Sequence, residues 1–472
     1  MITLKADPST TFVGGDFNRL YIWAISSVGA LGGLLFGYDW VVIGGAKPFY
    51  EKFFHLTQPS LQGWAMSCAL IGCLIGALTS AKLGGRYGRR RLLMLAALMF
   101  TISSLGTAWA NQFVAFVVWR IVGGFAIGLA SSVSPMYIAE VAPAHLRGKL
   151  VSLNQLAIVI GILLAQLVNW FIARPVPPYA TFDQILNSWD GQLGWRWMFG
   201  VTAIPSLLFL FATFLMPESP RWLVQRGLRE NGRTILARIG GEDYANHVLS
   251  DMDTTSPSGA GKTDFQTLRE PKMMKILVLG VVLAVLQQWC GINVIFNYAE
   301  EVFSAAGYQV SDILFNIIIT GAVNLIFTLV AIFCVDRFGR RVLMLIGAGG
   351  LAVIYTVLGL LYHFKSHGLP MLLLVIAAIG CYAMSLAPVT WVVISEIFPN
   401  KIRGTAMSLS ITALWVACFI LTYSFPLLNR ALGAAGTFWI YAGVCMAGFL
   451  YLRVFLPETK GKSLEEIEQS WT

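Results

Sequence analysis

Long uninterrupted apolar runs dominate the chain. Twelve stretches of 19 or more residues contain no Asp, Glu, Lys or Arg, namely 20–38, 61–81, 92–119, 121–139, 150–173, 197–217, 276–299, 313–335, 342–362, 368–395, 404–429 and 431–452. Each is as long as the roughly 20 residues that a helix needs to cross the hydrocarbon core of a bilayer. The runs lack the alternation of a membrane barrel strand, so helices are the expected spanning form. The pattern predicts an all-α membrane protein with twelve transmembrane helices.

The composition and the placement of charge agree with this prediction. Hydrophobic residues make up 57% of the chain and charged residues 12%, against roughly 25% charged residues in soluble domains. The net charge of +9 is compatible with nucleic-acid binding, but the basic residues gather in alternate short loops. The loops after the second, fourth, eighth and tenth runs hold twelve Lys and Arg, whereas the short loops of the other side hold six. By the positive-inside rule, we expect both termini in the cytoplasm and no nucleic-acid partner.

Signals for metal, cofactor or enzymatic chemistry are missing from the sequence. The seven cysteines fall inside apolar runs without C-x-x-C spacing, and the five histidines fall outside the runs. Neither arrangement indicates a metal site, a disulfide or a histidine proton relay. Because no Walker loop or catalytic triad signature occurs either, we expect no cofactor and no enzymatic activity.

The two halves of the chain repeat three short signatures in the same order. The matched pairs are Gly85–Arg90 with Asp336–Arg341, Glu140–Pro143 with Glu396–Pro399, and Pro217–Ser219 with Pro457–Thr459. Parallel repeats about an axis along the membrane normal are typical of secondary transporters. The pattern predicts a six-helix half over 1–216, a cytoplasmic helical linker over 217–275, a second six-helix half over 276–456 and a cytoplasmic tail over 457–472.

Seven motifs in register resemble those of the sugar porters of the major facilitator superfamily, over nearly the whole chain. They are GGRYGRR at 84–90, PMYIAEVAPAHLRG at 135–148, PESPRWL at 217–223, QQWCGIN at 287–293, DRFGRR at 336–341, SEIFPNKIRG at 395–404 and PETKGKSLEE at 457–466. Within the family, the stretches 135–155 and 36–39 look most like the bacterial D-xylose:proton symporters. The resemblance implies the major facilitator fold in a bacterial inner membrane, alternating access, and a monosaccharide and a proton as transported partners.

Two ionisable residues interrupt the apolar runs, Asp39 and Arg120. Charged groups inside a bilayer are costly, and they usually face a cavity or each other. Asp39 could take and release a proton while a nearby Arg120 favours its ionised form. Alternatively, the two could form a static ion pair between the first and fourth helices. In the family an acid at this position accompanies proton coupling, so the resemblance favours a proton-coupling role for both residues.

An uncharged sugar needs amides that donate and accept hydrogen bonds and aromatic rings that pack on its apolar face. The apolar runs contain such amides, although a buried amide more often joins two helices. The resemblance reverses this preference, because several amides and aromatics match sugar-binding positions of the family. The substrate-binding residues that we expect are Phe36, Gln155, Gln287, Gln288, Asn293, Asn324, Trp391 and Trp415.

Some positions near this site depart from the family pattern. Leu414 stands where the xylose symporters have a glutamine, and Asn297 stands where the family usually has a second tyrosine. An amide lost at one place and gained at another would change which sugar hydroxyls are recognised. Pro388 replaces part of a glycine-rich break in the tenth helix. We expect Pro388 to bend the tenth helix and Gly291 to bend the seventh, and bent half-helices beside the site can serve as gates.

Charges of both signs gather in the loops of the repeated signatures. Positive charge there can serve topology alone. The resemblance implies a further role, in which Arg and Glu side chains tie the cytoplasmic helix ends together while the outer side is open. Exposed ion pairs are individually weak, which suits a contact that breaks in every cycle. The expected cytoplasmic gate residues are Arg86, Arg90, Glu140, Arg147, Glu218, Arg337, Arg341, Glu396, Arg403 and Glu458, with Arg89 and Arg340 beside them.

The sequence thus predicts a secondary active transporter that moves D-xylose, or a similar aldose such as D-glucose, inward with a proton. A proton-independent sugar uniporter is the main alternative, and Asp39 argues against it. A transporter-like sugar sensor is a second alternative, for which the linker and the short tail offer little surface. The oligomeric state is left open, with a monomer as the expectation.

Overall fold

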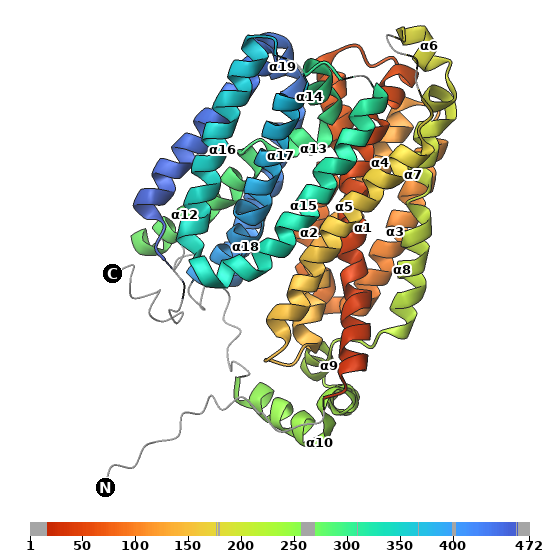
Figure 1. Ribbon diagram of the computed structural model, residues 1–472. Coiled ribbons are helices and arrows are strands. Elements are labelled where there is room, and N and C mark those ends of the chain that lie inside the picture. The colour runs from red at the N-terminus through yellow and green to blue at the C-terminus, as the bar shows by residue number, and fades with distance from the viewer. Residues whose placement is uncertain are drawn as a thin grey trace.

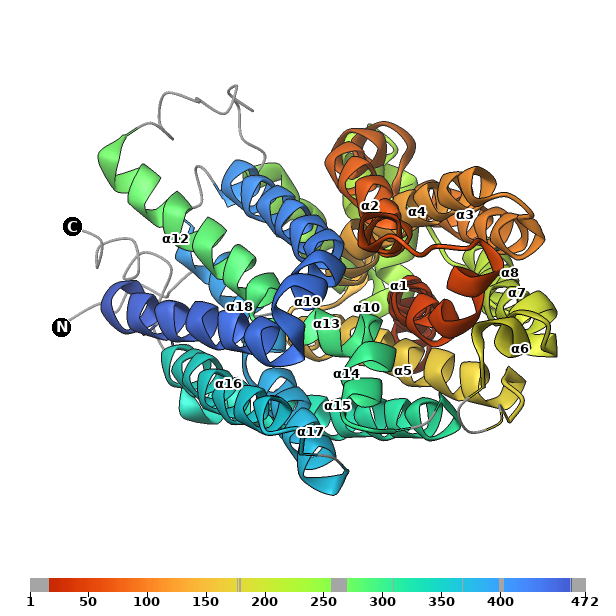
Figure 2. The same ribbon diagram turned by 90° about the horizontal axis from the view of Figure 1, so that it is seen from above.

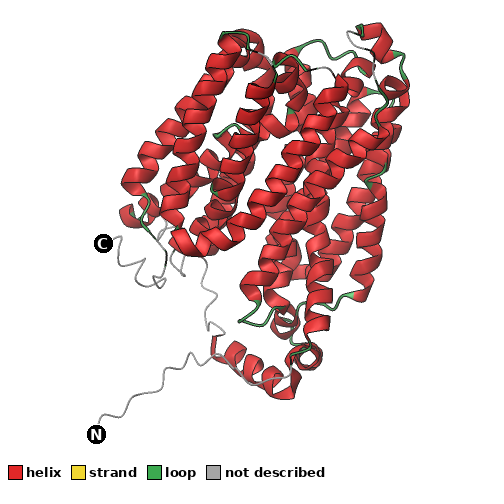
Figure 3. Cartoon of the chain, viewed as in Figure 1, coloured by secondary structure: helices red, strands yellow, loops and turns green. Residues whose placement is uncertain are grey.

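The computed structural model describes residues 17–175, 177, 180–255, 270–308, 310–366, 368–398, 403–458 and 460, which form helices and no strand (Figure 3). The helices of the first half are α1 (Arg19–Phe53), α2 (Pro59–Tyr87), α3 (Arg89–Trp109), α4 (Phe113–Val141), α5 (Arg147–Ile172), α6 (Phe182–Leu186), the π-helix η1 (Asp190–Gly194), α7 (Trp195–Gly200) and α8 (Ala203–Leu215). Two linker helices follow, α9 (Pro220–Gln225) and α10 (Arg229–Thr255). The helices of the second half are α12 (Pro271–Trp289), α13 (Ile292–Asn297), α14 (Ala299–Ala305), α15 (Val310–Phe338), α16 (Arg340–His363), α17 (Leu369–Met384), α18 (Leu386–Ile397) and α19 (Arg403–Phe455).

The described residues contain eleven helical stretches that are long and apolar enough to span a membrane. The last is α19, whose 53 residues include Gly433 with a non-helical φ of 67° and ψ of 176°. Glycine adopts positive φ without strain, so α19 turns back there as two spanning arms, drawn in blue in Figure 1. Counting both arms, the twelve predicted spanning helices are present.

The spanning helices form two bundles that lie side by side (Figures 1 and 2). In the first bundle α1 packs on α5 and α2 on α4, and in the second α12 and α16 pack on α19. Between the bundles, α2 packs on α19 and α5 on α15. The linker helices α9 and α10 lie at one end of the molecule, here called the linker end, and α6 and α14 lie at the opposite end, the distal end (Figure 1).

The first helix is longer than its apolar run indicates. The charge-free run ends at 38, but α1 continues to Phe53. Lys47 and Glu51 therefore lie within a spanning helix, where they are 2% and 9% exposed. The expectation that Asp39 and Arg120 are the only two charged groups inside the spanning segments is therefore wrong. Lys47 and Glu51 can be buried there because they form an ion pair with each other, which reduces the cost of burying either charge.

Other helix boundaries also move. α3 ends at Trp109 and α4 begins at Phe113, so the run 92–119 covers parts of two helices, and Arg120 lies inside the fourth helix as expected. The sixth spanning segment begins at Asp190 and passes through η1 and α7 before α8. The second half begins at Pro271, several residues before its apolar run, because proline is well suited to the first turn of a helix.

The described part of the polar insertion between the halves contains the two helices α9 and α10. The Ser219 side chain caps α9 by accepting a hydrogen bond from the Trp222 backbone N–H, which is a common way to begin a helix. α10 bends at Gly240 and Gly241. It has a small apolar core separate from the main one, made of Leu236, Ala245 and Leu249.

Two spanning helices of the second bundle are broken. The seventh passes from α12 to α13 at Gly291, whose φ of 84° is left-handed. The tenth passes from α17 to α18 at Ser385, with φ of −127° and ψ of −88°. Pro388 then lies in the first turn of α18, where its missing N–H removes no helical hydrogen bond. The expected bend at Gly291 is present, whereas the bend in the tenth helix precedes Pro388.

Two glycines let the bundles approach each other closely towards the distal end. A Cβ atom added to Gly44 of α1 would lie 2.8 Å from the backbone oxygen of Phe296 in α13. One added to Gly63 of α2 would overlap the backbone oxygen of Tyr423 in α19. A side chain in either place would push the other bundle away, so these glycines permit the close contact.

Candidate substrate and proton site

Arg120 of α4 holds Asp39 of α1 by both carboxylate oxygens. Its Nη1 donates to Oδ1 and Oδ2, each at 3.0 Å, and its Nη2 donates to the backbone oxygen of Asp39 at 3.4 Å. Asp39 is 3% exposed and Arg120 is 2% exposed. The guanidinium also lies over the ring of Phe199, 5.3 Å from its centroid. The expected contact between Arg120 and the first helix is therefore present, and each charge offsets the cost of burying the other.

Small residues bring together the helices around this pair. Gly37 lets α1 approach the backbone of α5 at Ile158, and Gly124 lets α4 approach the backbone of α2. A Cβ atom on Gly123 would lie 3.7 Å from Asp39 Oδ2, which is an ordinary contact distance. Small residues are typical of close helix packing in membranes. The ion pair is thus positioned by four packed helices and not by a loop.

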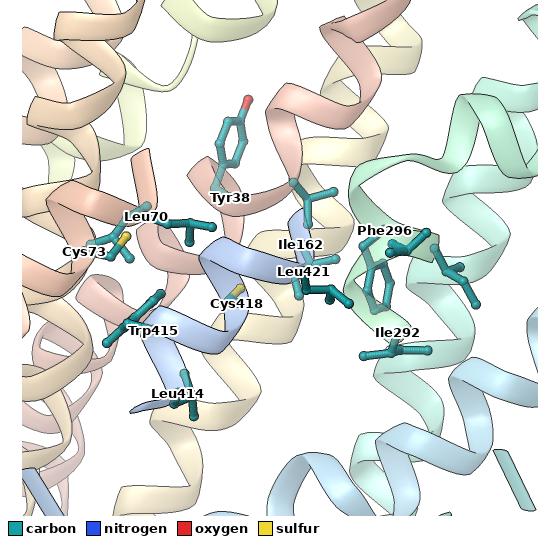
Figure 4. Packing of buried hydrophobic residues seen from close by; sticks show 14 of the residues in the cluster. Tyr38, Leu70, Cys73, Ile162, Ile292, Phe296, Leu414, Trp415, Cys418 and Leu421 are labelled. Atoms are coloured by element: carbon teal, nitrogen blue, oxygen red, sulfur yellow. The ribbon is translucent and has the colours of Figure 1, made fainter. Parts of the chain in front are cut away.

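Three aromatic rings gather where α1 meets α19. The ring centroids of Phe36 and Trp40 are 6.0 Å apart, those of Phe36 and Trp415 6.2 Å, and those of Trp40 and Trp415 6.1 Å. Trp40 was not among the expected residues, although it directly follows Asp39 in the sequence. The rings come from both bundles. Figure 4 shows Trp415 on α19 beside Leu70 and Cys73 of the first bundle.

Three amide side chains of the second bundle form a hydrogen-bonded chain. Asn293 Nδ2 donates to Gln288 Oε1, and Gln288 Nε2 donates to Gln287 Oε1 at 3.4 Å. Gln287 Nε2 donates to the backbone oxygen of Ala387 at 3.2 Å, just after the break in the tenth helix. All three amides are buried. The broken segments of helices seven and ten thus meet through groups that can also bind hydroxyls.

The other expected substrate residues lie apart from this chain. Gln155 is half-buried on α5, Asn324 is buried on α15, and Trp391 is 39% exposed on α18. In the part of the chain that the structure describes, none of them is hydrogen-bonded to the three amides. Their roles in binding therefore stay predictions.

The two residues that depart from the family pattern are both buried. Leu414 is 4% exposed and precedes Trp415. Asn297 is 5% exposed, and its Oδ1 has no hydrogen-bond partner among the described residues. With Arg120 and Trp40, Asn297 lines a cavity of about 10 Å³, which is about the space that one water needs. Asn297 therefore lies beside the ion pair, a position that the sequence did not indicate.

At the linker end, Glu218 binds the start of α3. Its Oε1 accepts hydrogen bonds from the backbone N–H groups of Arg89 at 2.8 Å and Arg90 at 3.1 Å. The Arg89 side chain in turn donates to Glu140 Oε1 of α4 at 2.8 Å. The Arg90 side chain donates to two backbone oxygens at the end of α8, where the helix dipole favours a cation.

The second bundle repeats this arrangement. Glu458 accepts hydrogen bonds from the backbone N–H groups of Arg340 at 2.9 Å and Arg341 at 3.2 Å. The Arg340 side chain lies 3.3 Å from Glu396 Oε1, and the Arg341 side chain donates to the backbone oxygen of Arg453 at 2.7 Å. The duplication that the sequence motifs indicate therefore extends to individual hydrogen bonds.

Among the clustered arginines, Arg89 and Arg340 form the ion pairs with Glu140 and Glu396. Arg86 lies over the ring of its neighbour Tyr87, 5.3 Å from the centroid. The helix-end arginines that were expected to form the gate thus divide between carboxylate and backbone contacts. Arg337 is exposed at the end of α15.

The remaining gate residues add little to this picture. Arg147 Nε donates to the backbone oxygen of Ala139 at 3.1 Å. Arg403 begins α19, and its side chain lies outside what the structure describes. The two ion pairs of the preceding paragraphs each join helices of one bundle, so a tie between the bundles at the linker end stays a prediction.

At the distal end, Lys47 of α1 meets three glutamates that the sequence analysis did not select. Its Nζ lies 3.1 Å from Glu51 Oε2, 3.4 Å from Glu300 Oε2 and 2.5 Å from Glu301 Oε1. The charge-free runs leave 46–60 among the short loops between helices, so they do not indicate this cluster. The available signal is the i, i+4 spacing of Lys47 and Glu51, which is typical of a helical ion pair.

Comparison with known proteins assigns the family. A family model described as "Sugar (and other) transporter" matches residues 25–471. The chain belongs to this family. It is 40% identical to the D-xylose-proton symporter of Escherichia coli strain K12 over 487 aligned residues, covering 97% of each chain.

Solved structures of related sugar transporters have the same fold. Against the inward-open conformation of the xylose transporter from E. coli, the TM-score is 0.83, with 39% identity over 96% of this chain and 100% of that chain. Against the proton:xylose symporter bound to 6-bromo-6-deoxy-D-glucose it is 0.78, with 39% identity over 97% and 100%. The predicted major facilitator fold and the assignment to sugar transport are confirmed, and the chain is a membrane transporter and not an enzyme.

Proposed function

We propose that this sugar transporter imports D-xylose, or a similar aldose such as D-glucose, together with a proton. The observation that carries the proposal is the buried ion pair of Asp39 and Arg120, next to aromatic rings from both bundles. An acid buried in a spanning helix is a functional site by default. The names of the relatives supply the sugar class, since the symporter from E. coli acts on D-xylose.

The ion pair is suited to proton coupling. Arg120 Nη1 contacts both oxygens of Asp39, so a proton on either oxygen removes one of these hydrogen bonds and the charge attraction. Protonation thereby loosens the contact between α1 and α4, and loss of the proton restores it. Arg120 is in this account a positioning residue that acts through Asp39.

The sugar site consists of the amide chain and the aromatic rings. In this structure, Gln287, Gln288 and Asn293 satisfy one another, and a sugar hydroxyl can take the place of either contact, because amides donate and accept. Gln155, Asn324 and Trp391 extend the site from α5, α15 and α18 once the bundles close around the sugar. Phe36 and Trp415 supply the faces that pack on the ring.

The linker end faces the cytoplasm in this proposal, because the loops there carry the excess of Lys and Arg. The distal end then faces outward, and a bacterial inner membrane fits the relatives. The ten expected gate residues hold the cytoplasmic helix ends together when the outer side opens. A monomer is sufficient for this cycle, since both bundles belong to one chain.

Counterflow of labelled sugar into proteoliposomes tests the proposal. The panel contains D-xylose, L-arabinose, D-glucose and D-galactose, each measured with and without an inward proton gradient. We expect counterflow with one or two aldoses and net accumulation only with the gradient. Counterflow without gradient-driven accumulation would favour the uniporter, and the absence of both with every sugar would favour the sensor.

A further inference from the structure

A buried charged cluster joins the two bundles at the distal end. It consists of Lys47 and Glu51 from α1 of the first bundle and Glu300 and Glu301 from α14 of the second. The Lys47 side chain is 3% exposed, and the ion pairs to Glu300 and Glu301 measure 3.4 Å and 2.5 Å. The three N–H groups of the ammonium thus have three carboxylate partners, two of them across the boundary between the bundles.

The cluster has more negative than positive charge. Three carboxylates surround one ammonium, which gives a formal charge of −2 if all are ionised. Glu51 Oε1 and Glu301 Oε2 are buried and have no hydrogen-bond partner among the described residues. An unpaired buried carboxylate oxygen is costly. The cost falls if the cluster binds a proton, since a protonated carboxyl is uncharged and its O–H can donate.

The cluster is buried around the ammonium and partly exposed on the α14 side: the Lys47 side chain is 3% exposed, and those of Glu300 and Glu301 are 21% and 23% exposed. Lys47 Nζ lies over the ring of Tyr298, 5.8 Å from its centroid, and Tyr50 is fully buried one turn away on α1. One turn before Lys47 on α1, Gly44 lies close to the α13 backbone on the same boundary between the bundles. Electrostatic attraction at the buried Lys47 ammonium is stronger than it would be in water.

We propose that Lys47, Glu51, Glu300 and Glu301 form an ionic lock, which holds the distal end closed and takes up a proton as it closes. The lock rests on the proposed function only for the statement that the distal end faces outward. To admit sugar from outside, the transporter must separate α1 from α14 and so break the pairs of Lys47 with Glu300 and Glu301. Lys47 keeps Glu51 as a partner within α1 when it does so.

Proton uptake has a defined sign in this lock. Burial raises the pKa of Glu301 above its ordinary value, while Lys47 acts in the opposite direction. The titratable groups facing Glu301 are Glu300 on its own helix, Tyr298 just before it, and Lys47, Tyr50 and Glu51 on α1; α15, which packs on α14, has Asp312 in its first turn. A carboxyl with a raised pKa binds its proton more tightly when the lock is closed. By linkage, acid favours the closed distal end and alkali favours the open one.

Distances between spin labels at the two ends test the lock without requiring transport. One pair is placed at the distal end, on Gln58 and Ala431, and one at the linker end, on Lys149 and Met274; all four positions are exposed. Attaching the labels to genetically encoded p-acetylphenylalanine leaves the seven native cysteines in place. The purified, sugar-free protein is measured by double electron–electron resonance at pH 6 and pH 9.

The variant that isolates the contact between bundles is Glu300→Gln with Glu301→Gln, because Lys47 then still has Glu51. We expect the ratio of open to closed distal ends to rise at least tenfold, with shorter distances at the linker end. Lys52→Met is the matched control, since Lys52 lies on α1 but donates to the backbone oxygen of Pro48 within that helix. Distance distributions of the double variant that equal those of the control would overturn the lock.

A charge reversal distinguishes loss of the ion pair from a general loss of structure. Lys47→Glu alone should open the distal end, and Lys47→Glu combined with Glu301→Lys should close it again. Failure of the combined variant to regain the closed distance, although it is folded, would contradict the pairing. In the original protein, alkali should lengthen the distal distance, and this response should vanish in the Glu300→Gln, Glu301→Gln variant. If the response persists there, proton uptake belongs to another group.

Labelling of a distal position in intact cells tests the proposed orientation independently of the ionic lock. A membrane-impermeant reagent should reach Gln58→Cys from outside. If it does not, the orientation is wrong while the distance results on the lock still stand. A chain that shows the lock in these distances but no counterflow would contradict the proposed transport function alone.

Discussion

Arg120 Nη1 lies 3.0 Å from both carboxylate oxygens of Asp39, and the two side chains are almost completely buried between α1 and α4. Removal of one member of a buried ion pair leaves the other charge without compensation, whereas removal of both leaves no buried charge. The pair therefore links the stability of the first bundle to the proton-carrying chemistry proposed for Asp39.

The ion pair predicts that the effect on stability of replacing Arg120 depends on whether Asp39 is still charged. Arg120→Met should lower the free energy of unfolding by about 3–5 kcal/mol, the typical cost of breaking a buried pair. Combining it with Asp39→Asn should recover most of this loss. Thermal unfolding in detergent measures both, with Arg233→Met on the exposed side of α10 as the control. A double variant no more stable than Arg120→Met would show that the two charges do not depend on each other.

The amide chain predicts weaker sugar binding when it is shortened. Gln288→Ala removes the acceptor of Asn293 and a donor to Gln287. Each lost hydrogen bond to a sugar hydroxyl is worth about 0.5–1.5 kcal/mol, so affinity should fall several-fold or more. Isothermal titration calorimetry with the transported sugar measures this.

The control for this series is Gln112→Ala, at an exposed position that makes no capping hydrogen bond. Gln155→Ala and Asn293→Ala complete the series. Unchanged affinity in all three site variants would place the sugar elsewhere.

The glycine at the boundary of α1 and α13 predicts a steric effect. Gly44→Ala places a Cβ atom 2.8 Å from the backbone oxygen of Phe296, so the distal end should close less completely and transport should slow. Gly443→Ala is the matched control, because a Cβ atom there meets nothing within 4 Å. The distal spin-label distance and the rate of counterflow report the effect. Equal behaviour of the two variants would mean that the approach at Gly44 is not needed.

The linker-end charges predict a shift in the opposite direction. Glu140 Oε2 is buried without a partner among the described residues, while Oε1 binds Arg89. The free oxygen can accept an arginine of the other bundle when the cytoplasmic side shuts. Glu140→Gln should then favour the inward-open state, and a loss of about 1.4 kcal/mol changes the ratio of states tenfold. The linker-end spin labels should report longer distances, with the exposed Glu230→Gln as the control.

The same spin-label measurement extends to the second bundle with Glu396→Gln. If neither substitution changes the distances in folded protein, the charges at the linker end serve topology and local helix packing alone. The pairs of Arg89 with Glu140 and of Arg340 with Glu396 would then act within single bundles.

Much of the fold follows from the sequence, because a backbone in contact with lipid forms helices here and each apolar run is long enough for one helix to cross the membrane once. The repeated glycine-arginine motifs also anticipate the matched contacts of Glu218 and Glu458. Charge-free runs do not give the full length of a helix where charged side chains pair inside the protein. Lys47 and Glu51 look like loop residues in a hydropathy profile, but their partner helix carries Glu300 and Glu301 far away in the chain.

The site was predictable to the extent that its chemistry is local. Asp39 stands out as an acid directly after an apolar run, whereas Trp40 and Asn297 owe their positions to packing between bundles. The break at Ser385 also escaped the sequence analysis, since the residue has no special backbone preference and is bent by its context. The left-handed φ of Gly291, by contrast, could be expected, because glycine adopts positive φ without strain.

Sugar-induced proton movement in proteoliposomes tests the central claim most directly. Addition of the transported aldose to vesicles without an imposed gradient should make the outer medium more alkaline, as protons enter with the sugar. Asp39→Asn should abolish this pH change and all gradient-driven accumulation while counterflow continues, because an amide fills the same space but carries no proton. The exposed Asp312→Asn should behave like the original protein. A pH change that persists in Asp39→Asn, or sugar entry without any pH change in the original protein, would contradict proton coupling through Asp39.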